Sequence, residues 1–164
     1  MQDEMVIRDV EPLDVEAVVA IAVAAWAPIY ASYRGIMGDD LFAAAHADWQ
    51  AKKAADVRAA CRPGHGAQVC VAQIGGEVEG FATFRADNDS GVGELGNNAV
   101  RPDCQGKGIG TALYEQVFDR LEGLGMRYVK VGTGGDPAHA PARRAYEKAG
   151  FSIELPGVVY FRAV

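Results

Sequence analysis

Positive charge is scarce in this chain. Its 164 residues include 16 Lys and Arg against 22 Asp and Glu, which gives a formal net charge of −6. A nucleic-acid-binding surface needs basic residues that displace counterions from phosphates. We therefore expect no nucleic-acid partner. The negative charge is compatible with a cationic acceptor such as an amine, although surface charge that maintains solubility is the simpler explanation.

Cysteine and histidine are also rare, with three residues of each. Cys61, Cys70 and Cys104 are odd in number and far apart, which fits neither a disulfide framework nor the spacing of metal ligands. The histidines are equally scattered, so we expect no metal site. They are His46, His65 and His139.

Long apolar runs and a basic leader are missing as well. No run of eighteen apolar residues occurs, so we expect no membrane span. The chain begins "MQDEMVIRDV", which is acidic and lacks the basic-then-apolar pattern of a signal peptide. These features predict one domain, residues 1–164, located in the cytoplasm. The length is sufficient for a hydrophobic core of its own.

Strand-like segments recur along the chain. The alternation of apolar and polar residues predicts a first strand at 5–10. Two further runs flank Gly75-Gly76, which is a hairpin signal. A fourth strand is predicted at 92–100 and a fifth at 126–132, joined by a helix, so that this pair is parallel with a right-handed crossover. The runs 151–155 and 158–164 are expected to finish the sheet.

Helical spacing appears in four places. The first predicted helix covers 14–30, and Pro28 is expected to end or bend it; the second reaches from 39 or 40 to about 60. The third follows a glycine-rich stretch to about 121, and the last has Pro141 in its first turn and Gly150 after its end. The expected fold is α+β: a mixed, mainly antiparallel sheet with helices on both faces and one parallel pair, formed by the fourth and fifth strands around the binding centre.

The glycine-rich stretch "RPDCQGKGIGTAL" stands where the third helix should begin. Glycine lowers the stability of a helix, so several glycines are expected there only where backbone without side chains is needed. A P-loop requires Ser or Thr after its lysine, but Gly108 follows Lys107; the dinucleotide fingerprint requires a different glycine spacing. Neither phosphate-binding motif is therefore present, but the physical basis of both motifs still applies. Free amides at a helix start bind an anionic phosphate, and missing side chains allow its approach. A glycine-rich helix–helix contact is the structural alternative.

The stretch resembles the acetyl-CoA motif of the GNAT superfamily of N-acetyltransferases, Gln/Arg-x-x-Gly-x-Gly/Ala after a strand. Here it lies within "AVRPDCQGKGIGTAL" and reads Gln105-Gly106-Lys107-Gly108-Ile109-Gly110. A second segment, "ARRAYEKAGF" at 142–151, is similar to the family's helix-to-strand segment with its tyrosine. The two motifs occur in the family's order, and together they cover roughly the C-terminal half of the chain.

The resemblance implies acetyl-CoA as the donor co-substrate. In the family its pantetheine arm lies along the fourth strand like an added strand. That contact would use backbone groups of Asn98, Ala99 and Val100, which can also be ordinary buried strand residues. The pyrophosphate would rest on backbone amides of the glycine stretch. The residues concerned are Gln105, Gly106, Lys107, Gly108, Ile109, Gly110 and Thr111.

Two residues match the family's catalytic positions. Tyr146 corresponds to the tyrosine that protonates the departing thiolate, although a core tyrosine would show the same helical spacing. Glu94 lies on the fourth strand, where related enzymes often carry a carboxylate base; a structural glutamate is the alternative. A backbone amide near Ala99 is the expected donor to the thioester oxygen.

Two further residues near the motifs are ambiguous. His139 stands where many family members have an asparagine that contacts the coenzyme arm, so we assign it to coenzyme binding; capping of the last helix or action as a base stay open. Cys104 is adjacent to the glycine stretch and is interpreted as a bystander thiol, because direct attack by the amine needs no acetyl-enzyme.

The sequence therefore predicts an acetyl-CoA-dependent N-acetyltransferase that acts on a primary amine of a small molecule or peptide by direct attack. The alternative is a non-catalytic CoA-binding sensor or regulatory module. Trp26, Tyr30 and Tyr33 are candidate walls of the acceptor pocket. Homodimers are common in the family, which makes a homodimer the assembly to test for.

Overall fold

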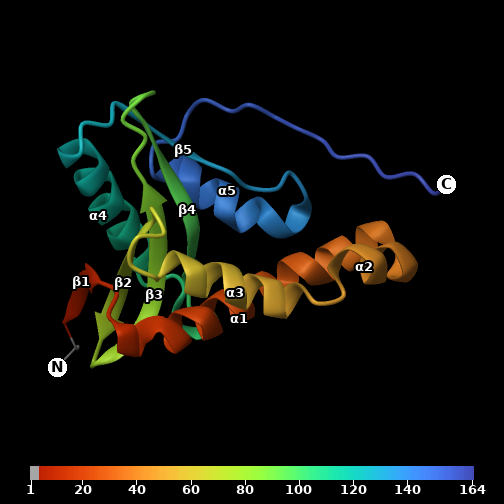
Figure 1. Ribbon diagram of the computed structural model, residues 1–164, viewed down its shortest axis with the longest axis horizontal. Coiled ribbons are helices and arrows are strands. Elements are labelled where there is room, and N and C mark those ends of the chain that lie inside the picture. The colour runs from red at the N-terminus through yellow and green to blue at the C-terminus, as the bar shows by residue number, and fades with distance from the viewer. Residues whose placement is uncertain (1–3) are drawn as a thin grey trace.

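A five-stranded sheet organises the fold in the computed structural model, which describes residues 4–164 (Figure 1). The strands lie in sequence order, and every neighbouring pair is antiparallel except the last, which is parallel. The mixed, mainly antiparallel sheet with one parallel pair is therefore confirmed. The strands are β1 (Met5–Asp9), β2 (Gln68–Ile74), β3 (Glu77–Arg85), β4 (Val92–Val100) and β5 (Tyr128–Val131).

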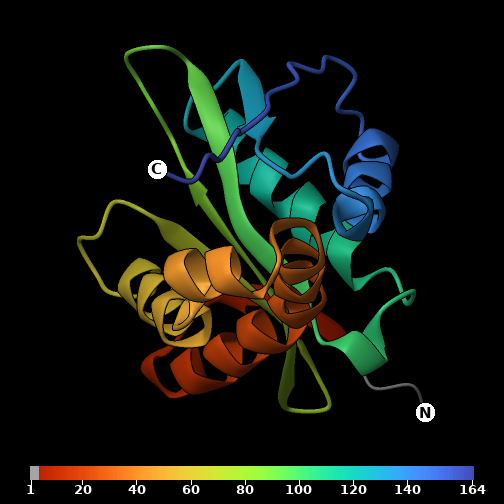
Figure 2. The same cartoon turned by 90° about the vertical axis from the view of Figure 1, so that its right-hand side faces the viewer.

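Helices cover both faces of the sheet, as expected (Figure 2). On one face, α1 and α3 bury an apolar cluster against β2 and β3 that includes Val71 and Phe81. On the other face, α4 packs over Phe84 and Leu95, and α5 adds Tyr146 to the same cluster. The helices are α1 (Val15–Met37), α2 (Asp39–His46), α3 (Trp49–Ala60), α4 (Ile109–Gly123) and α5 (Ala140–Lys148).

The first two predicted helices differ from the observed ones. α1 continues through Pro28 to Met37, because the missing N–H removes only one hydrogen bond and Pro28 lies on an exposed side. The helix predicted to reach 60 is divided into α2 and α3, because Asp48, with φ −111° and ψ 28°, leaves the helical region.

By length and composition alone, the segment Pro12–Met37 could cross a membrane, with a mean hydropathy of 1.7. In the fold its residues Val18, Val19, Ile21 and Ala22 are buried in the apolar cluster of the first face. A core helix has this same combination of length and hydropathy.

The two terminal strands predicted at 151–155 and 158–164 are wrong. This segment has no regular secondary structure, and Figure 1 shows it running away from the sheet after α5. Phe151 still packs against the core, but the apolar side chains that follow it are exposed, with Ile153 at 93% and Leu155 at 96%. Alternation indicates only a propensity, whereas a strand requires paired backbone groups. Pro156, which has no N–H to donate, also interrupts the run.

Halfway along β4, the pairing with β5 ends and a bulge changes the side of the sheet to which the side chains point. Phe84 pairs with Leu95 and Ala82 with Asn98, so three steps on β4 oppose two steps on β3, and an extra residue is accommodated as a bulge. The parallel pairing to β5 ends at Leu95. Before the bulge Glu94 faces the side of α1 and α3, and after it Asn98 faces the side of α4. The sheet is therefore open beside the second half of β4.

Packing between β4 and α4 has no room for a side chain at Gly93. A Cβ there would lie 2.8 Å from both methyl carbons of the buried Leu121. We expect Gly93→Ala to lower the free energy of unfolding by about 1–3 kcal/mol through overpacking. The matched control is Gly123→Ala, which adds a methyl group in open space at the end of α4. Urea denaturation should show no loss of stability for the control; equal stability of both variants would contradict this packing.

Candidate active site

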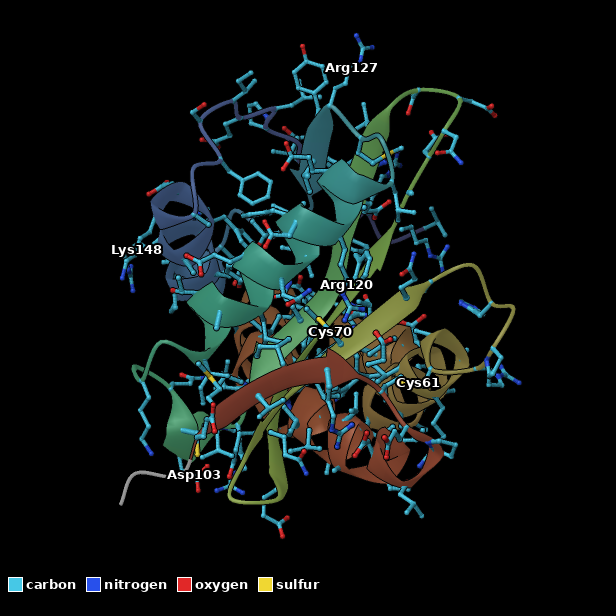
Figure 3. The ribbon with its side chains drawn as sticks, turned by 90° about the vertical axis from the view of Figure 1, so that its left-hand side faces the viewer. Cys61, Cys70, Asp103, Arg120, Arg127 and Lys148 are labelled. Atoms are coloured by element: carbon cyan, nitrogen blue, oxygen red, sulfur yellow. The ribbon has the colours of Figure 1, made fainter. Side chains whose placement is uncertain are left out.

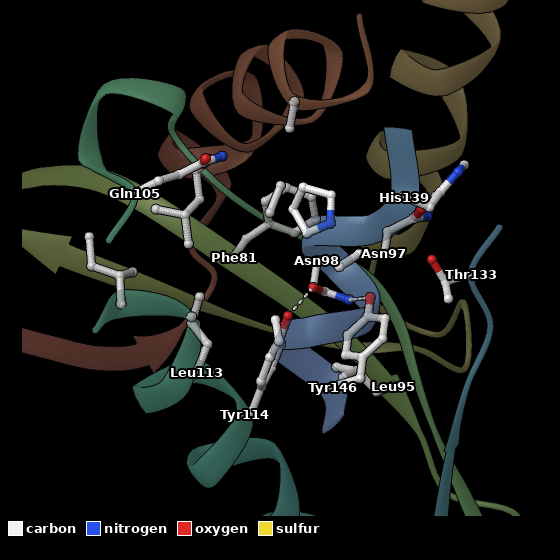
Figure 4. Close-up of a pocket in the computed structure, with 18 of the residues that line it drawn as sticks. Phe81, Leu95, Asn97, Asn98, Gln105, Leu113, Tyr114, Thr133, His139 and Tyr146 are labelled. Carbon is white, nitrogen blue, oxygen red and sulfur yellow. Dashed lines mark hydrogen bonds between the residues drawn. The ribbon is translucent and has the colours of Figure 1, made fainter. Parts of the chain in front are cut away.

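A cavity of about 880 Å³ lies beside the open half of β4 (Figure 4). Its walls come from β4, from the middle of α1, from the start of α4 and from α5 with the loop before it. Most of the predicted site residues line it: Glu94, Asn98, Ala99, Val100, Gln105, Gly106, Gly108, Ile109, Gly110, Thr111, His139 and Tyr146. Lys107 is exposed and is not part of this lining.

The glycine stretch forms one wall with its backbone. Gly106 and Gly108 have φ values of 78° and 83°, in the left-handed region that favours glycine, and no atom lies within 4 Å of a Cβ built on either. The Ala112 amide makes the first hydrogen bond of α4, to the Gly108 carbonyl at 3.0 Å. The helix-start N–H groups that precede this bond have no intrahelical partner, and the helix dipole favours negative charge there.

A buried carboxylate holds this loop against β3. Glu79 accepts a hydrogen bond from the thiol of Cys104 at 3.2 Å and pairs with the Nε atom of Arg101 at 3.0 Å. Arg101 also pairs with Asp103, which is labelled in Figure 3, at 2.7 Å. The sequence analysis missed Glu79. Its only signal was a charged residue within the apolar run of β3, at a position that the structure buries.

The backbone of β4 forms the floor of the cavity. Asn98, Ala99 and Val100 pair with β3 on one side, and on the other side no strand accompanies them within the described chain. Gln105 donates from Nε2 to the Val100 carbonyl at 3.3 Å. An extended ligand with amide groups fits such an edge.

Tyr146 reaches the cavity from α5 and belongs to a network of three side chains (Figure 4). Asn98 donates from Nδ2 to the Tyr146 hydroxyl at 3.1 Å, and the Tyr114 hydroxyl donates to Asn98 Oδ1 at 2.8 Å. Burial raises the pKa of Tyr146 above its ordinary value of 10.0, against the opposing effect of these hydrogen bonds. Tyr146 is therefore a protonated hydroxyl with a fixed position. Sequence analysis did not find Tyr114, which looks like an ordinary core residue of α4.

Glu94 lines the cavity on the other face of the sheet. Its side chain is 48% exposed, and Lys130 Nζ lies 3.5 Å from its carboxylate. Beside it, Asn97 accepts from Lys53 at 3.1 Å and donates to Asp56 at 2.9 Å, so this side chain connects β4 to α3. Glu94 thus lies half-exposed in the cavity with a lysine close by.

His139 lies at the end of the cavity that α1 closes. Its Nδ1 atom contacts the Asp136 carboxylate, and Ser32 in α1 donates to the same carboxylate at 3.0 Å. Neither Asp136 nor Ser32 was expected here. Trp26 lines the cavity as expected, whereas Tyr30 and Tyr33 lie outside its lining. Within residues 4–164, no group of three or more His, Cys, Asp or Glu residues is arranged to hold a metal ion.

The raised pKa of Tyr146 is measurable. Tyrosinate absorbance near 295 nm should be recorded against pH for the wild type and for Tyr146→Phe. We expect the tyrosine missing from the variant to titrate above pH 10, because burial disfavours its charged form. The associated stability is present below pH 10 and is lost as the pH rises through the folded pKa. If the difference between the two absorbance curves has its midpoint at or below pH 10, the hydroxyl of Tyr146 is not buried as described.

Comparison with known proteins gives this geometry a context. The profile of the "Acetyltransferase (GNAT) family" matches residues 27–151. Mycothiol acetyltransferase of Sanguibacter keddieii is 34% identical over 87 residues, which are 50% of this chain and 27% of that protein. The chain thus corresponds to about a quarter of that relative.

Solved structures share the fold. The PaiA N-acetyltransferase of Thermoplasma acidophilum, in complex with coenzyme A, superposes with a TM-score of 0.73 at 17% identity and covers 92% of this chain and 91% of its own. The ribosomal-protein-S18-alanine N-acetyltransferase of Escherichia coli gives 0.63 at 23% identity, with 93% and 80% covered. The profile match across most of the chain shows that it belongs to the GNAT family of acetyltransferases.

Proposed function

We propose that this protein transfers the acetyl group of acetyl-CoA to a primary amine by direct attack of the amine on the thioester. One observation carries the proposal: the start of α4 with its glycine-rich loop, an open strand edge and a buried tyrosine hydroxyl meet in a single cavity. Each of these groups meets a different need of the coenzyme or of the reaction. Their combination is not required for the packing of the fold.

The coenzyme would lie across the α4 side of the cavity. Its diphosphate binds the amides of 105–111, where the helix dipole and absent side chains favour an anion. Its pantetheine arm runs beside Asn98, Ala99 and Val100 as an added strand. The thioester then lies where β4 separates from β5, close to the Tyr146 hydroxyl.

Tyr146 supplies the proton that the departing thiolate needs. A raised pKa keeps the hydroxyl protonated at neutral pH. The same burial makes a thiolate in the cavity more basic, so the two groups remain matched for proton transfer. A backbone amide near Ala99 would stabilise the charge that develops on the thioester oxygen.

The acceptor would approach from the α1 side. That wall presents Trp26, Pro28 and Ile29, while Glu94 and His139 bring the ionisable groups. The acceptor is therefore a primary amine carried by a small molecule or a peptide end with an apolar part. Either of the two ionisable groups can deprotonate it, and Glu94 remains a candidate base.

The first test measures release of free thiol from acetyl-CoA with a panel of primary amines. We expect turnover with at least one amine and a fall in kcat of at least about tenfold, or 1.4 kcal/mol, for Tyr146→Phe. Binding of CoA, measured by calorimetry, should be retained by the variant. Tight CoA binding without turnover on any amine would instead identify a sensor or regulatory module.

The second test distinguishes loss of the diphosphate site from the backbone strain that any substitution of a left-handed glycine causes. Gly108→Ala places a methyl group at φ +83°, in the space that a diphosphate would occupy, and we expect the Kd for CoA to rise about tenfold or more. Gly64→Ala is the matched control, because it has φ +80° and open space in a distant loop. Equal CoA affinity of the two variants would contradict a diphosphate site at Gly108.

A further inference from the structure

The loop between β5 and α5 holds a partly buried ionisable pair. Asp136 and His139 contact each other through a carboxylate oxygen and Nδ1, and each side chain is only 12% exposed. His139 lines the cavity. For the Nε2 atom, no hydrogen-bond partner occurs within residues 4–164. No buried side-chain nitrogen or oxygen of this part of the chain lacks a partner, so Nε2 is accessible.

Four hydrogen bonds fix the position of this pair and its loop. Ser32 Oγ donates to Asp136 Oδ2 at 3.0 Å across 104 residues of sequence, and the Ala138 amide donates to the same oxygen at 3.2 Å. Arg143 Nη1 donates to the carbonyls of Gly134 and Asp136, at 2.5 and 2.9 Å. A Cβ at Gly134 would lie 2.4 Å from His139 Nδ1, so only glycine lets the ring occupy this place.

Helix capping does not account for the imidazole. His139 stands at the N-cap position of α5 but makes no side-chain cap hydrogen bond. The capping in this loop is done by Asp136, which accepts from the Ala138 amide at the preceding 3₁₀ turn (Pro137–His139). The ring is oriented by the carboxylate through one nitrogen while the other nitrogen is free, which is the arrangement of an oriented general base.

We propose that His139, oriented by Asp136, is the general base that deprotonates the acceptor amine in this chain. This inference rests on the proposed acetyltransferase function. Glu94, the base expected from the sequence, is nearly half exposed and lies next to Lys130. The His139 side chain is only 12% exposed, and its ring lies 5.9 Å from that of Tyr33 in α1, the helix beside which the acceptor is proposed to approach.

The proton movements balance with these two groups. His139 Nε2 takes one proton from the acceptor ammonium, which leaves a neutral amine. The amine nitrogen forms a bond to the thioester carbon as the carbon–sulfur bond breaks, and the sulfur takes the proton of the Tyr146 hydroxyl. The Tyr146 oxygen then takes the second proton from the new amide nitrogen, and His139 releases its proton to solvent.

Several other ionisable groups lie near His139 and must be considered when a pH profile is interpreted. Asp136 shares its loop: burial would raise the pKa of this carboxyl, but hydrogen bonds from His139 and Ser32 outweigh burial and lower it. From α1, Tyr33 presents its ring at 5.9 Å, and burial, followed by the charge of Asp136, raises its pKa. Arg143 contributes a cation from α5, and His46 of α2 stacks on the far side of Tyr33.

The test is the pH dependence of acetyl transfer by the full chain. For the wild type we expect kcat/KM to fall on the acid side with one inflection. His139→Gln should remove that inflection and lower kcat about 100-fold, with the KM for acetyl-CoA nearly unchanged. Added imidazole should restore part of the activity of His139→Ala.

Two controls make each outcome decisive. His65→Gln removes an exposed histidine that contacts Arg85 and should leave kinetics and pH profile unchanged. If Glu94→Gln removes the inflection and His139→Gln keeps it, the inference is wrong. It is also wrong if His139→Gln raises only the KM for acetyl-CoA, which would assign coenzyme binding, or if imidazole rescues nothing. Absence of turnover by the wild type with every amine would contradict the proposed function itself.

Discussion

The separation of β4 from β5 after Leu95 is the constraint on which the rest of the site depends. A parallel pair that continued to Val100 would pair the backbone that now faces the cavity. The bulge around Asn97 adds a second effect, because it exchanges the faces to which the following side chains point. As a result, Glu94 and Asn98 belong to one strand but serve opposite sides of the sheet. Donor and acceptor can therefore approach the same point from different sides.

The absence of side chains at Gly106 and Gly108 determines which charge the loop before α4 can accommodate. Two left-handed glycines turn successive amides toward one space, and no side chain fills it. Glu79 of β3 stabilises this exposed backbone through its contacts with Arg101 and Cys104. Because Glu79 is buried, its pairing with the guanidinium is screened less than a surface ion pair. The loop proposed to bind the diphosphate is thus held in place by a buried carboxylate.

Local patterns made much of this predictable. The Gly75-Gly76 hairpin, the glycine-rich helix start and the strand–helix–strand crossover each depend on residues close in sequence, and all three are observed. The extra residue in β4 gave no signal, because a bulge depends on the register of the neighbouring strand. The contact between Ser32 and Asp136 spans 104 residues and joins helix α1 to the loop before α5, and neither segment signals this contact in the sequence. The terminal segment shows the converse, since its alternation is real but has no pairing partner in the described structure.

Cys104 has a consequence of its own. Its sulfur lines the cavity in which a thioester would be held, and a thiolate at that distance could exchange acyl groups with the coenzyme. Burial, together with the hydrogen bond to Glu79, raises the pKa of this thiol and keeps it as S–H. A neutral thiol is a poor nucleophile. If acetyl-CoA binds as proposed, the contact that anchors the loop would therefore also keep Cys104 from taking up the acetyl group.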